Sequence, residues 1–275
     1  MHTIRYAFMG LLLAACGDNN NNGNDGGTDA GNDVVNSNTF SQTGTIVDYS
    51  SKKGLPGMVV TGGGSTVSTD TTGAYTLAVP KNAAYTMTVA SAADADTTYL
   101  TLNEQEWTLS GNVDRGKTSA VSNLTENLLK GILQPQPDNA LAVLTIQVIA
   151  TGACASATGS KVSVPGLPAP DAGPADGGTG PYLDYFSGGF PSTTATSVED
   201  GQLPSAIIWD LPVSASFNTV TVTPPNGCTV VAFPTVDPGD AGPGPNLSYT
   251  GNVKLEPSQP QPGLNVASFM RVFLK

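Results

Sequence analysis

The stretch TDTTGAYTLAVP, residues 69–80, carries the pattern that decides the fold. It opens with a turn signal, because Thr, Asp and Gly cluster immediately before an apolar run. After Gly73, apolar residues alternate with small or polar ones, so Tyr75, Leu77 and Val79 fall on one face of an extended strand. Period-two alternation after a tight turn is typical of an antiparallel sheet with one buried face.

The same pattern recurs on both sides of this stretch. Thr45–Val47 and Met58–Val60 are short strand-like runs separated by the turn Lys52–Gly57, and Tyr85–Val89 alternates again. The chain contains 32 Gly and 21 Pro but only 12% charged residues, a composition that favours turns and short strands over helices. Many short strands at close spacing predict a β-sandwich.

Four blocks in this region carry a resemblance to a known family. They are Gly44-x-Ile46-x-Asp48, Gly54-Leu55-Pro56-Gly57-x-Val59-Val60, Thr69-Asp70-x-x-Gly73-x-Tyr75-x-Leu77-x-Val79-Pro80 and Tyr85-x-Met87-x-Val89. In order and spacing, over about residues 40–90, they resemble the carboxypeptidase regulatory-like domain. The resemblance implies a transthyretin-like, Ig-like seven-stranded sandwich that has no catalytic residues of its own.

The second half of the chain repeats this arrangement loosely. Strand patterns occur at Leu144–Val148, Gly159–Val164, Ile207–Leu211, Phe217–Val222 and Asn265–Lys275. We therefore predict an all-β protein with two Ig-like, transthyretin-like antiparallel β-sandwich modules, residues 40–110 and 140–275. Residues 98–102 and 106–109 complete the first sandwich in this prediction.

Residues 111–139 form a connector with one short helix in this prediction. Within Ser122–Leu133, apolar residues recur at helical spacing, and Pro135 prevents much continuation. These residues are Leu124, Leu128, Leu129, Ile132 and Leu133. We expect the helix to be amphipathic and to pack between the two modules.

The N-terminal segment 1–15 has the layout of a secretory signal. Arg5 precedes an apolar run, Tyr6–Leu13, which is much shorter than the ~20 residues of a membrane-spanning helix. The tetrad Leu13-Ala14-Ala15-Cys16 resembles the lipobox of bacterial lipoproteins, which implies cleavage before Cys16 and acylation of its sulfur and amino group. The alternative is an ordinary signal peptide with a chance cysteine.

Residues 16–39 then form a lipidated cysteine followed by a tether. From Gly17 to Asn38 the chain is rich in Asn, Gly and Asp and has almost no apolar residue to bury, so we expect it to be disordered. A flexible coil of this length reaches about 25 Å. The resemblance to lipoproteins further implies the outer membrane, because Gly17 rather than Asp follows Cys16.

The two remaining cysteines, Cys154 and Cys228, are candidates for a disulfide. An exported chain matures in an oxidising compartment, and this bond would close a separation of 74 residues. Two separate buried thiols are the alternative.

Charge and residue usage exclude several functions. The formal net charge of −11 becomes −12 when Arg5 is removed, and such an acidic chain repels nucleic acid. The single histidine, His2, lies in the signal segment, so the processed chain has no histidine for acid–base catalysis or metal binding. We therefore expect no cofactor and no metal site.

Two clusters remain as candidate sites. Glu104 and Glu106 lie two residues apart, as an acid–base pair on one strand face would, although surface carboxylates are far commoner. Tyr182, Tyr185 and Phe186 precede Gly188-Gly189, and exposed aromatic residues there would serve sugar stacking or protein contact. The alternative is that these aromatic residues close the edge of the sandwich.

These observations predict a lipid-anchored envelope protein that is not an enzyme. Its role would be structural, adhesive or ligand-binding, with an envelope protein or a glycan as partner besides the membrane. The competing predictions are a carboxylate-based glycan hydrolase and an accessory subunit of an envelope complex.

Overall fold

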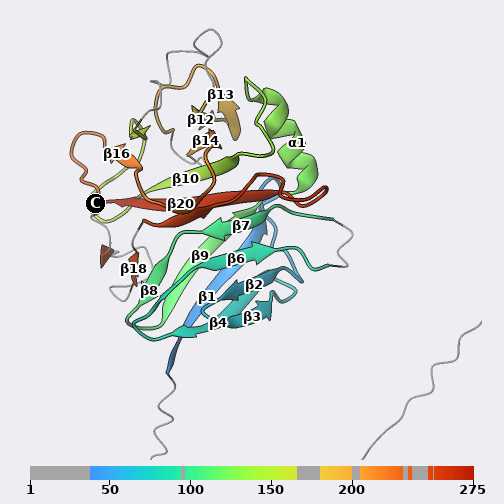
Figure 1. Cartoon of the computed structure of the whole chain (residues 1–275). Coiled ribbons are helices and arrows are strands. Elements are labelled where there is room, and N and C mark those ends of the chain that lie inside the picture. Colours follow the sequence, from blue (N-terminus) through green and yellow to red (C-terminus); the bar gives the residue numbers. More distant parts are fainter. Residues whose placement is uncertain are drawn as a thin grey trace, which may run out of the picture. The chain divides into compact units, whose positions relative to one another are not determined.

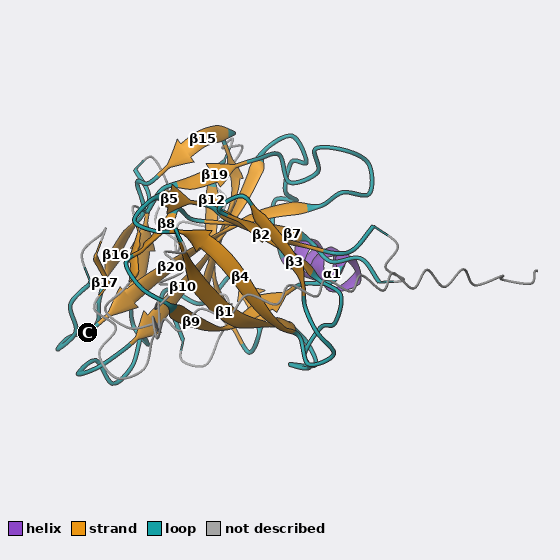
Figure 2. Ribbon diagram, turned by 90° about the horizontal axis from the view of Figure 1, so that it is seen from below, coloured by secondary structure: helices purple, strands orange, loops and turns teal. Residues whose placement is uncertain are grey.

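The computed structural model describes residues 38–93, 97–165, 180–199, 205–231, 235–236, 247–249 and 251–275. In this part of the chain the structure is mostly β with one short helix, which confirms the expected fold class (Figures 1 and 2). Contacts along the chain make Ser37–Lys275 one compact unit. No helix among the described residues is long and apolar enough to cross a membrane. Cys16 and the tether lie outside the described residues.

The elements of the described residues follow one another in this order. The first half contains β1 (Thr39–Asp48), β2 (Val59–Gly62), β3 (Ser65–Ser68), β4 (Ala74–Pro80), β5 (Ala84–Tyr85), β6 (Met87–Ala90), β7 (Thr101–Glu104), β8 (Trp107–Leu109) and β9 (Val113–Ala120). Helix α1 (Asn123–Ile132) follows. The second half contains β10 (Ala142–Ala150), β11 (Lys161–Ser163), β12 (Tyr182–Ser187), β13 (Phe190–Ser192), β14 (Ala206–Leu211), β15 (Ser214–Phe217), β16 (Thr221–Thr223), β17 (Thr235–Val236), β18 (Leu247–Tyr249), β19 (Val253–Leu255) and β20 (Val266–Leu274).

The opening stretch forms the predicted turn and strand. One carboxylate oxygen of Asp70 accepts hydrogen bonds from the Thr72 and Ala74 backbone N–H groups, at 2.8 and 3.0 Å, which closes the turn. Gly73 follows with φ +81°, and a Cβ there would lie 2.4 Å from the Ile46 carbonyl oxygen. Only glycine fits this position, so the turn packs tightly against β1.

The strand after this turn buries the face that the sequence predicts. In β4, Tyr75, Leu77 and Val79 are buried and alternate with less buried residues. The predicted strand Tyr85–Val89 is also buried on one face, but it is divided: β5 pairs with β8, and β6 pairs with β2 and β7. The chain therefore changes sheets between Tyr85 and Met87.

A nine-stranded sheet runs through both halves of the chain, in the order β13-β12-β14-β10-β20-β7-β6-β2-β3. The C-terminal strand β20 lies at its centre and pairs in parallel with β10 of the second half and β7 of the first. Parallel strands covered on both faces are apolar throughout, and eight of the nine β20 residues are buried. Figure 1 shows β20 between the two halves.

This continuity differs from the predicted organisation. We expected two antiparallel modules, 40–110 and 140–275, whereas the described strands include three parallel pairs, and β20 pairs with β7 of the first half, 165 positions away in sequence. Residues 113–120, assigned to the connector, form β9, which pairs with β1. The alternation of apolar and polar residues within a segment does not indicate which distant strand that segment pairs with.

Two groups of elements, here called the two coverings, pack on the same face of the nine-stranded sheet. Over the first half, the three-stranded sheet β4-β1-β9 packs against it around a core that includes Ile46, Leu77 and Leu102. Over the second half, α1 packs on β10, β12 and β14 through Leu129 and Leu133. Strands β11, β16 and β19 cover the opposite face of the second half. The two coverings meet between β9 and α1.

Helix α1 forms where the sequence predicts it. The Ser122 hydroxyl accepts a hydrogen bond from the Thr125 N–H at 3.2 Å and caps the first turn, while Leu133 is extended and ends the helix. Glu126 accepts a hydrogen bond from Asn265 and pairs with Lys130 at 2.7 Å. These contacts fix the helix to the segment that leads into β20.

Candidate ligand-binding cavity

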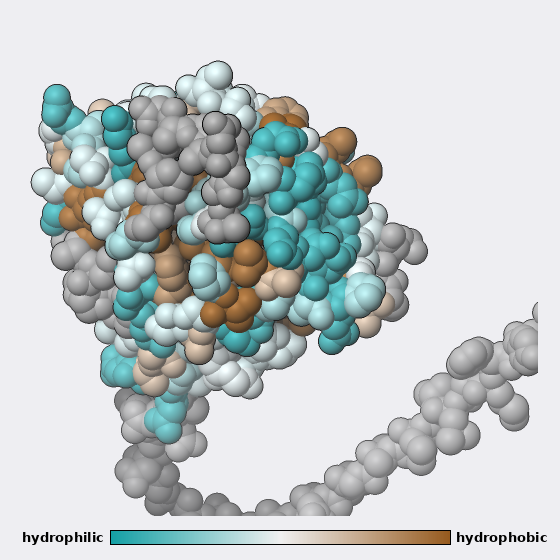
Figure 3. Space-filling view, turned by 45° about the horizontal axis from the view of Figure 1, so that its top comes forward, coloured by the Kyte–Doolittle hydropathy of each residue, from teal (hydrophilic) through white to brown (hydrophobic). Residues whose placement is uncertain are grey.

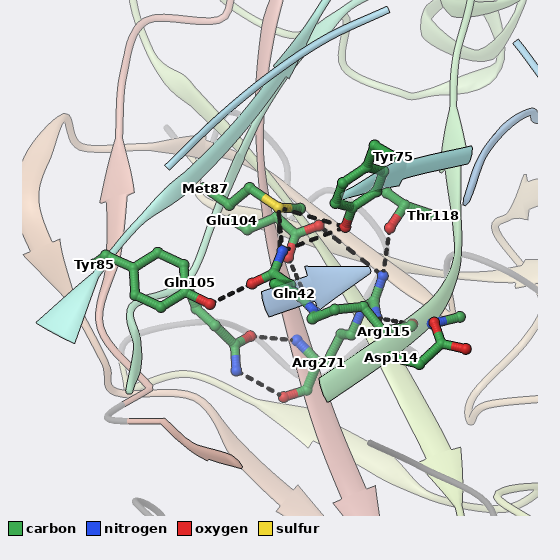
Figure 4. A network of polar contacts seen from close by, with 11 residues as sticks. Gln42, Tyr75, Tyr85, Met87, Glu104, Gln105, Asp114, Arg115, Thr118 and Arg271 are labelled. Carbon is green, nitrogen blue, oxygen red and sulfur yellow. Dashed lines mark hydrogen bonds and ion pairs between the residues drawn. The ribbon is translucent and has the colours of Figure 1, made fainter. Parts of the chain in front are cut away.

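The candidate carboxylate pair is divided by its surroundings. Glu104 is almost fully buried at the end of β7 and forms an ion pair with Arg115 of β9, while Glu106 lies after the strand end. The second Glu104 oxygen lies 4.0 Å from an Arg271 nitrogen of β20. The Arg115 guanidinium also stacks on Trp107, 4.0 Å from the ring centroid. Figure 4 shows Glu104 together with Arg115 and Arg271 in this network.

The neighbouring polar side chains complete a closed network. Gln42 donates to the Tyr75 hydroxyl at 3.3 Å and accepts a hydrogen bond from Tyr85. Arg271 donates to the Thr118 hydroxyl at 2.8 Å. Burial lowers the pKa of Arg271 to about 10, whereas for Arg115 the effect of burial is outweighed by Glu104, so its pKa is raised. The network joins β1, β4, β7, β9 and β20, and each carboxylate oxygen of Glu104 faces an arginine.

The exposed aromatic cluster predicted at residues 182–186 is not formed. These residues make strand β12, in which Tyr185 and Phe186 are buried and Tyr182 is half-buried. The Tyr185 hydroxyl accepts a hydrogen bond from the Val162 N–H at 2.7 Å, and Tyr182 stacks on Trp209 with ring centroids 5.4 Å apart. The aromatic residues therefore build the sheet, as the alternative interpretation held.

The predicted disulfide between Cys154 and Cys228 is present, with Cα atoms 5.0 Å apart. It joins the segment after β10 to the segment after β16, next to the core of the second half. No group of three or more acidic, histidine or cysteine side chains suited to a metal ion occurs within the described residues.

A cavity of about 80 Å³ lies where the two coverings of the sheet meet. Its floor is formed by Val143 of β10 and by Val266 and Ala267 at β20. Helix α1 closes one end with Leu129 and Leu133. The remaining apolar wall contains Leu100, Leu102, Val121, Phe186 and Ile207, with Tyr49 and Pro137. Glu126 and Lys130 of α1 also line this end and form an ion pair at 2.7 Å, and the other side chains here are apolar apart from the Tyr49 hydroxyl.

The other end of the cavity is polar and open to solvent. Lys117, Ser119, Thr145 and Gln147 line it, together with Phe269. Lys117 is exposed and the other four are half-buried, whereas the apolar residues at the α1 end are buried. Within the described residues, the Lys117 and Gln147 side chains form no hydrogen bond or ion pair. The mouth thus presents an ammonium group and an amide beside an apolar interior.

The outer face of α1 is also apolar. Leu124, Leu128 and Ile132 are 75%, 61% and 38% exposed, although Leu129 and Leu133 of the same helix are buried. In Figure 3 exposed apolar surface lies at the upper right, over α1. Phe190 of β13, a strand in contact with α1, is 52% exposed.

Sequence reasoning missed this cavity. The five apolar residues at helical spacing did not indicate it, because only Leu129 and Leu133 line the cavity, whereas Leu124, Leu128 and Ile132 are exposed. No local sequence pattern indicates the polar mouth, because Lys117 and Gln147 lie on strands from different halves of the chain.

The chain enters the described fold at the end opposite to this site. Strand β1 begins at Thr39 and β9 runs parallel to it, so α1, which follows β9, lies beyond the far end of β1 (Figure 1). Ten residues of strand span about 30 Å.

Comparisons with known proteins identify no family for this chain. No family model matches the chain. No curated protein matches it. A solved structure of a streptococcal ancillary pilin is similar over 87% of this chain, with 9% sequence identity and a TM-score of 0.25. The chain spans 63% of the length of that pilin chain.

Proposed function

We propose that this protein is a lipid-anchored binding protein of the bacterial cell envelope. The observation that carries the proposal is the cavity under α1, an apolar interior with a polar mouth that is open to solvent. Binding sites for small molecules commonly combine an apolar lining with a few polar groups at one end. The proposal gives the fold a non-catalytic task.

The anchor in this proposal is Cys16, with Gly17 after it favouring the outer membrane. Two or three acyl chains hold a protein on a membrane lastingly, because each buried methylene contributes roughly 0.8 kcal/mol. The tether would join the fold at Thr39, the start of β1, whereas α1 lies beyond the other end of that strand.

Metabolic labelling with radioactive palmitate tests the anchor. We expect label on the native protein and none on Cys16→Ser. An unlabelled native protein would contradict the lipid anchor but would leave the binding function open.

Mass spectrometry of small molecules that co-purify with the native protein tests binding. The variant Ser119→Phe places a bulky side chain at the mouth, where Ser119 is half-buried, and should lose such a molecule. The matched control Ser163→Phe changes an exposed serine on β11 and should retain it. Equal retention by both variants would contradict binding in this cavity.

The carboxylate-based hydrolase is less well supported, because Glu104 is held by two arginines without access to solvent. Measuring envelope-glycan hydrolysis with Glu106→Gln, which leaves the buried network intact, tests it. A turnover abolished by this change would favour the hydrolase.

A further inference from the structure

We infer that the cavity binds an unbranched medium-chain carboxylate, with its alkyl tail inside and its head group at Lys117 and Gln147. This inference rests on the proposed function in treating the cavity as a ligand site. It follows from three properties of the cavity: its lining, its size and the charge at its mouth.

The lining requires an apolar tail. Leu129, Leu133, Phe186 and Ile207 are all buried and present only carbon atoms to the cavity. The two charged residues of the α1 end, Glu126 and Lys130, are paired with each other, and Glu126 also accepts a hydrogen bond from Asn265. A polar ligand group placed there would lose its water without gaining a partner.

The size limits the length of the tail. A water-sized group needs roughly 10–15 Å³ of such space, so about 80 Å³ holds about five to eight groups of this size. A methylene is similar in size to a water molecule. The cavity therefore fits a straight chain of about five to eight carbons, and further carbons would remain outside the mouth.

The charge at the mouth selects an anion. The chain has a net charge of −11 and only eight lysines, yet two of them, Lys117 and Lys130, line this cavity. A further lysine, Lys52, lies 4.4 Å from the ring of Tyr49, which also lines the cavity. Glu126, the one acidic residue of the lining, is paired with Lys130. Lys117 is thus left to attract a carboxylate, and the amide of Gln147, which also lines the cavity, is a hydrogen-bond donor for it.

Calorimetric titration with straight-chain carboxylates tests the inference. The full processed polypeptide with Cys16→Ser, exported behind a cleavable signal, is used so that no lipid or detergent competes. Affinity should rise about fourfold per methylene from butanoate to octanoate and then level off. Octyltrimethylammonium, with the same tail and the opposite charge, should bind at least fivefold more weakly than octanoate.

Variants locate the site. Lys117→Gln should weaken octanoate binding about two- to fivefold and leave octanol binding unchanged. Lys161→Gln, which removes an exposed lysine on the opposite covering, should change neither. Ser119→Phe should abolish octanoate binding, and Ser163→Phe should not. If Ser119→Phe unfolds the protein, Thr145→Leu provides a second obstruction at the mouth.

Three results would overturn the inference: no heat of binding with any carboxylate, equal affinity for the cationic amphiphile, or affinity that keeps rising to dodecanoate. The last would indicate adsorption on the exposed face of α1. A different co-purified molecule that Ser119→Phe removes would leave the proposed function standing while refuting the carboxylate. The absence of palmitate on Cys16 affects neither outcome.

Discussion

Glu104 of β7 and Arg115 of β9 form an ion pair in which neither side chain exposes any surface to solvent. The pair joins the nine-stranded sheet to the three-stranded sheet that covers it. Arg271 of β20 lies 4.0 Å from the same carboxylate, so the last strand of the chain is tied to the first half through it. The positive charges of two guanidinium groups are thus compensated by one carboxylate inside this core (Figure 4).

The first prediction concerns this dependence. Glu104→Gln removes the negative charge and leaves two buried arginines without a counter-charge, which should lower the free energy of unfolding by about 3–5 kcal/mol. Urea unfolding measures the change. The control is Glu256→Gln, because Glu256 pairs with the exposed Lys254 and should contribute under about 1 kcal/mol. Equal losses of unfolding free energy in both variants would show that the buried ion pair stabilises the fold no more than the exposed one.

The second prediction concerns the disulfide. Cys154 and Cys228 are 74 residues apart in sequence, and in the chain-entropy model a closure of this length stabilises a fold by about 4 kcal/mol. The double variant with both cysteines changed to alanine should lose about this much free energy of unfolding. Adding reductant to the wild-type protein should lower its stability, whereas the double variant should not respond. A reductant-insensitive wild type would contradict the bond.

The sequence predicted those parts of the fold that depend on neighbouring residues. Turn residues and period-two alternation located β4, because Asp70 and Gly73 act within their own turn. The cap at Ser122 and the helical spacing located α1 for the same reason. The disulfide followed from cysteine count and compartment, which need no geometry.

Contacts between segments that are distant in sequence could not be predicted. The pairing of β20 with β7 joins Val266 to Thr101, and no local pattern distinguishes this strand from one that ends a separate module. Similarly, Glu104 is polar in a strand that alternates, so it was interpreted as a surface carboxylate until Arg115 and Arg271 were brought to it. The cavity lies where β9 and α1 meet over β10, and its lining is completed by β7, β12, β14 and β20, which are distant in sequence.

The third prediction separates the two faces of α1. Leu129 is 8% exposed and packs against Val143 and Phe186, so Leu129→Ala should cost about 2–5 kcal/mol of unfolding free energy. Leu128, its neighbour, is 61% exposed, and Leu128→Ala should change stability by under about 0.5 kcal/mol. Both substitutions keep a good helix former, so propensity does not confound the comparison. Similar losses would mean that the outer face is covered in solution.

The fourth prediction concerns Asp184 of β12, a buried carboxylate beside Ile207 in the strand register. Burial raises the pKa of this carboxyl to about 6, from an ordinary 3.8. Between about pH 4 and pH 6 the folded protein therefore keeps a proton that the unfolded chain has lost. For this group the free energy of unfolding falls as pH rises through that window, with a slope of at most about 1.4 kcal/mol per pH unit.

Urea unfolding of wild type and Asp184→Asn across pH 4 to 7 measures this contribution. The amide cannot ionise, so the stability of the variant relative to wild type should increase from pH 4 to about 6 and then remain constant. Asp70→Asn is the control, because hydrogen bonds from Thr72 and Ala74 lower the pKa of Asp70, so the stability that its carboxylate contributes is lost only as pH falls below about 4, and the difference between this variant and wild type should stay constant from about pH 5 to 7. A pH-independent difference between wild type and Asp184→Asn would mean that Asp184 is ionised in the folded protein throughout this range, with water or an unrecognised partner replacing its lost hydration.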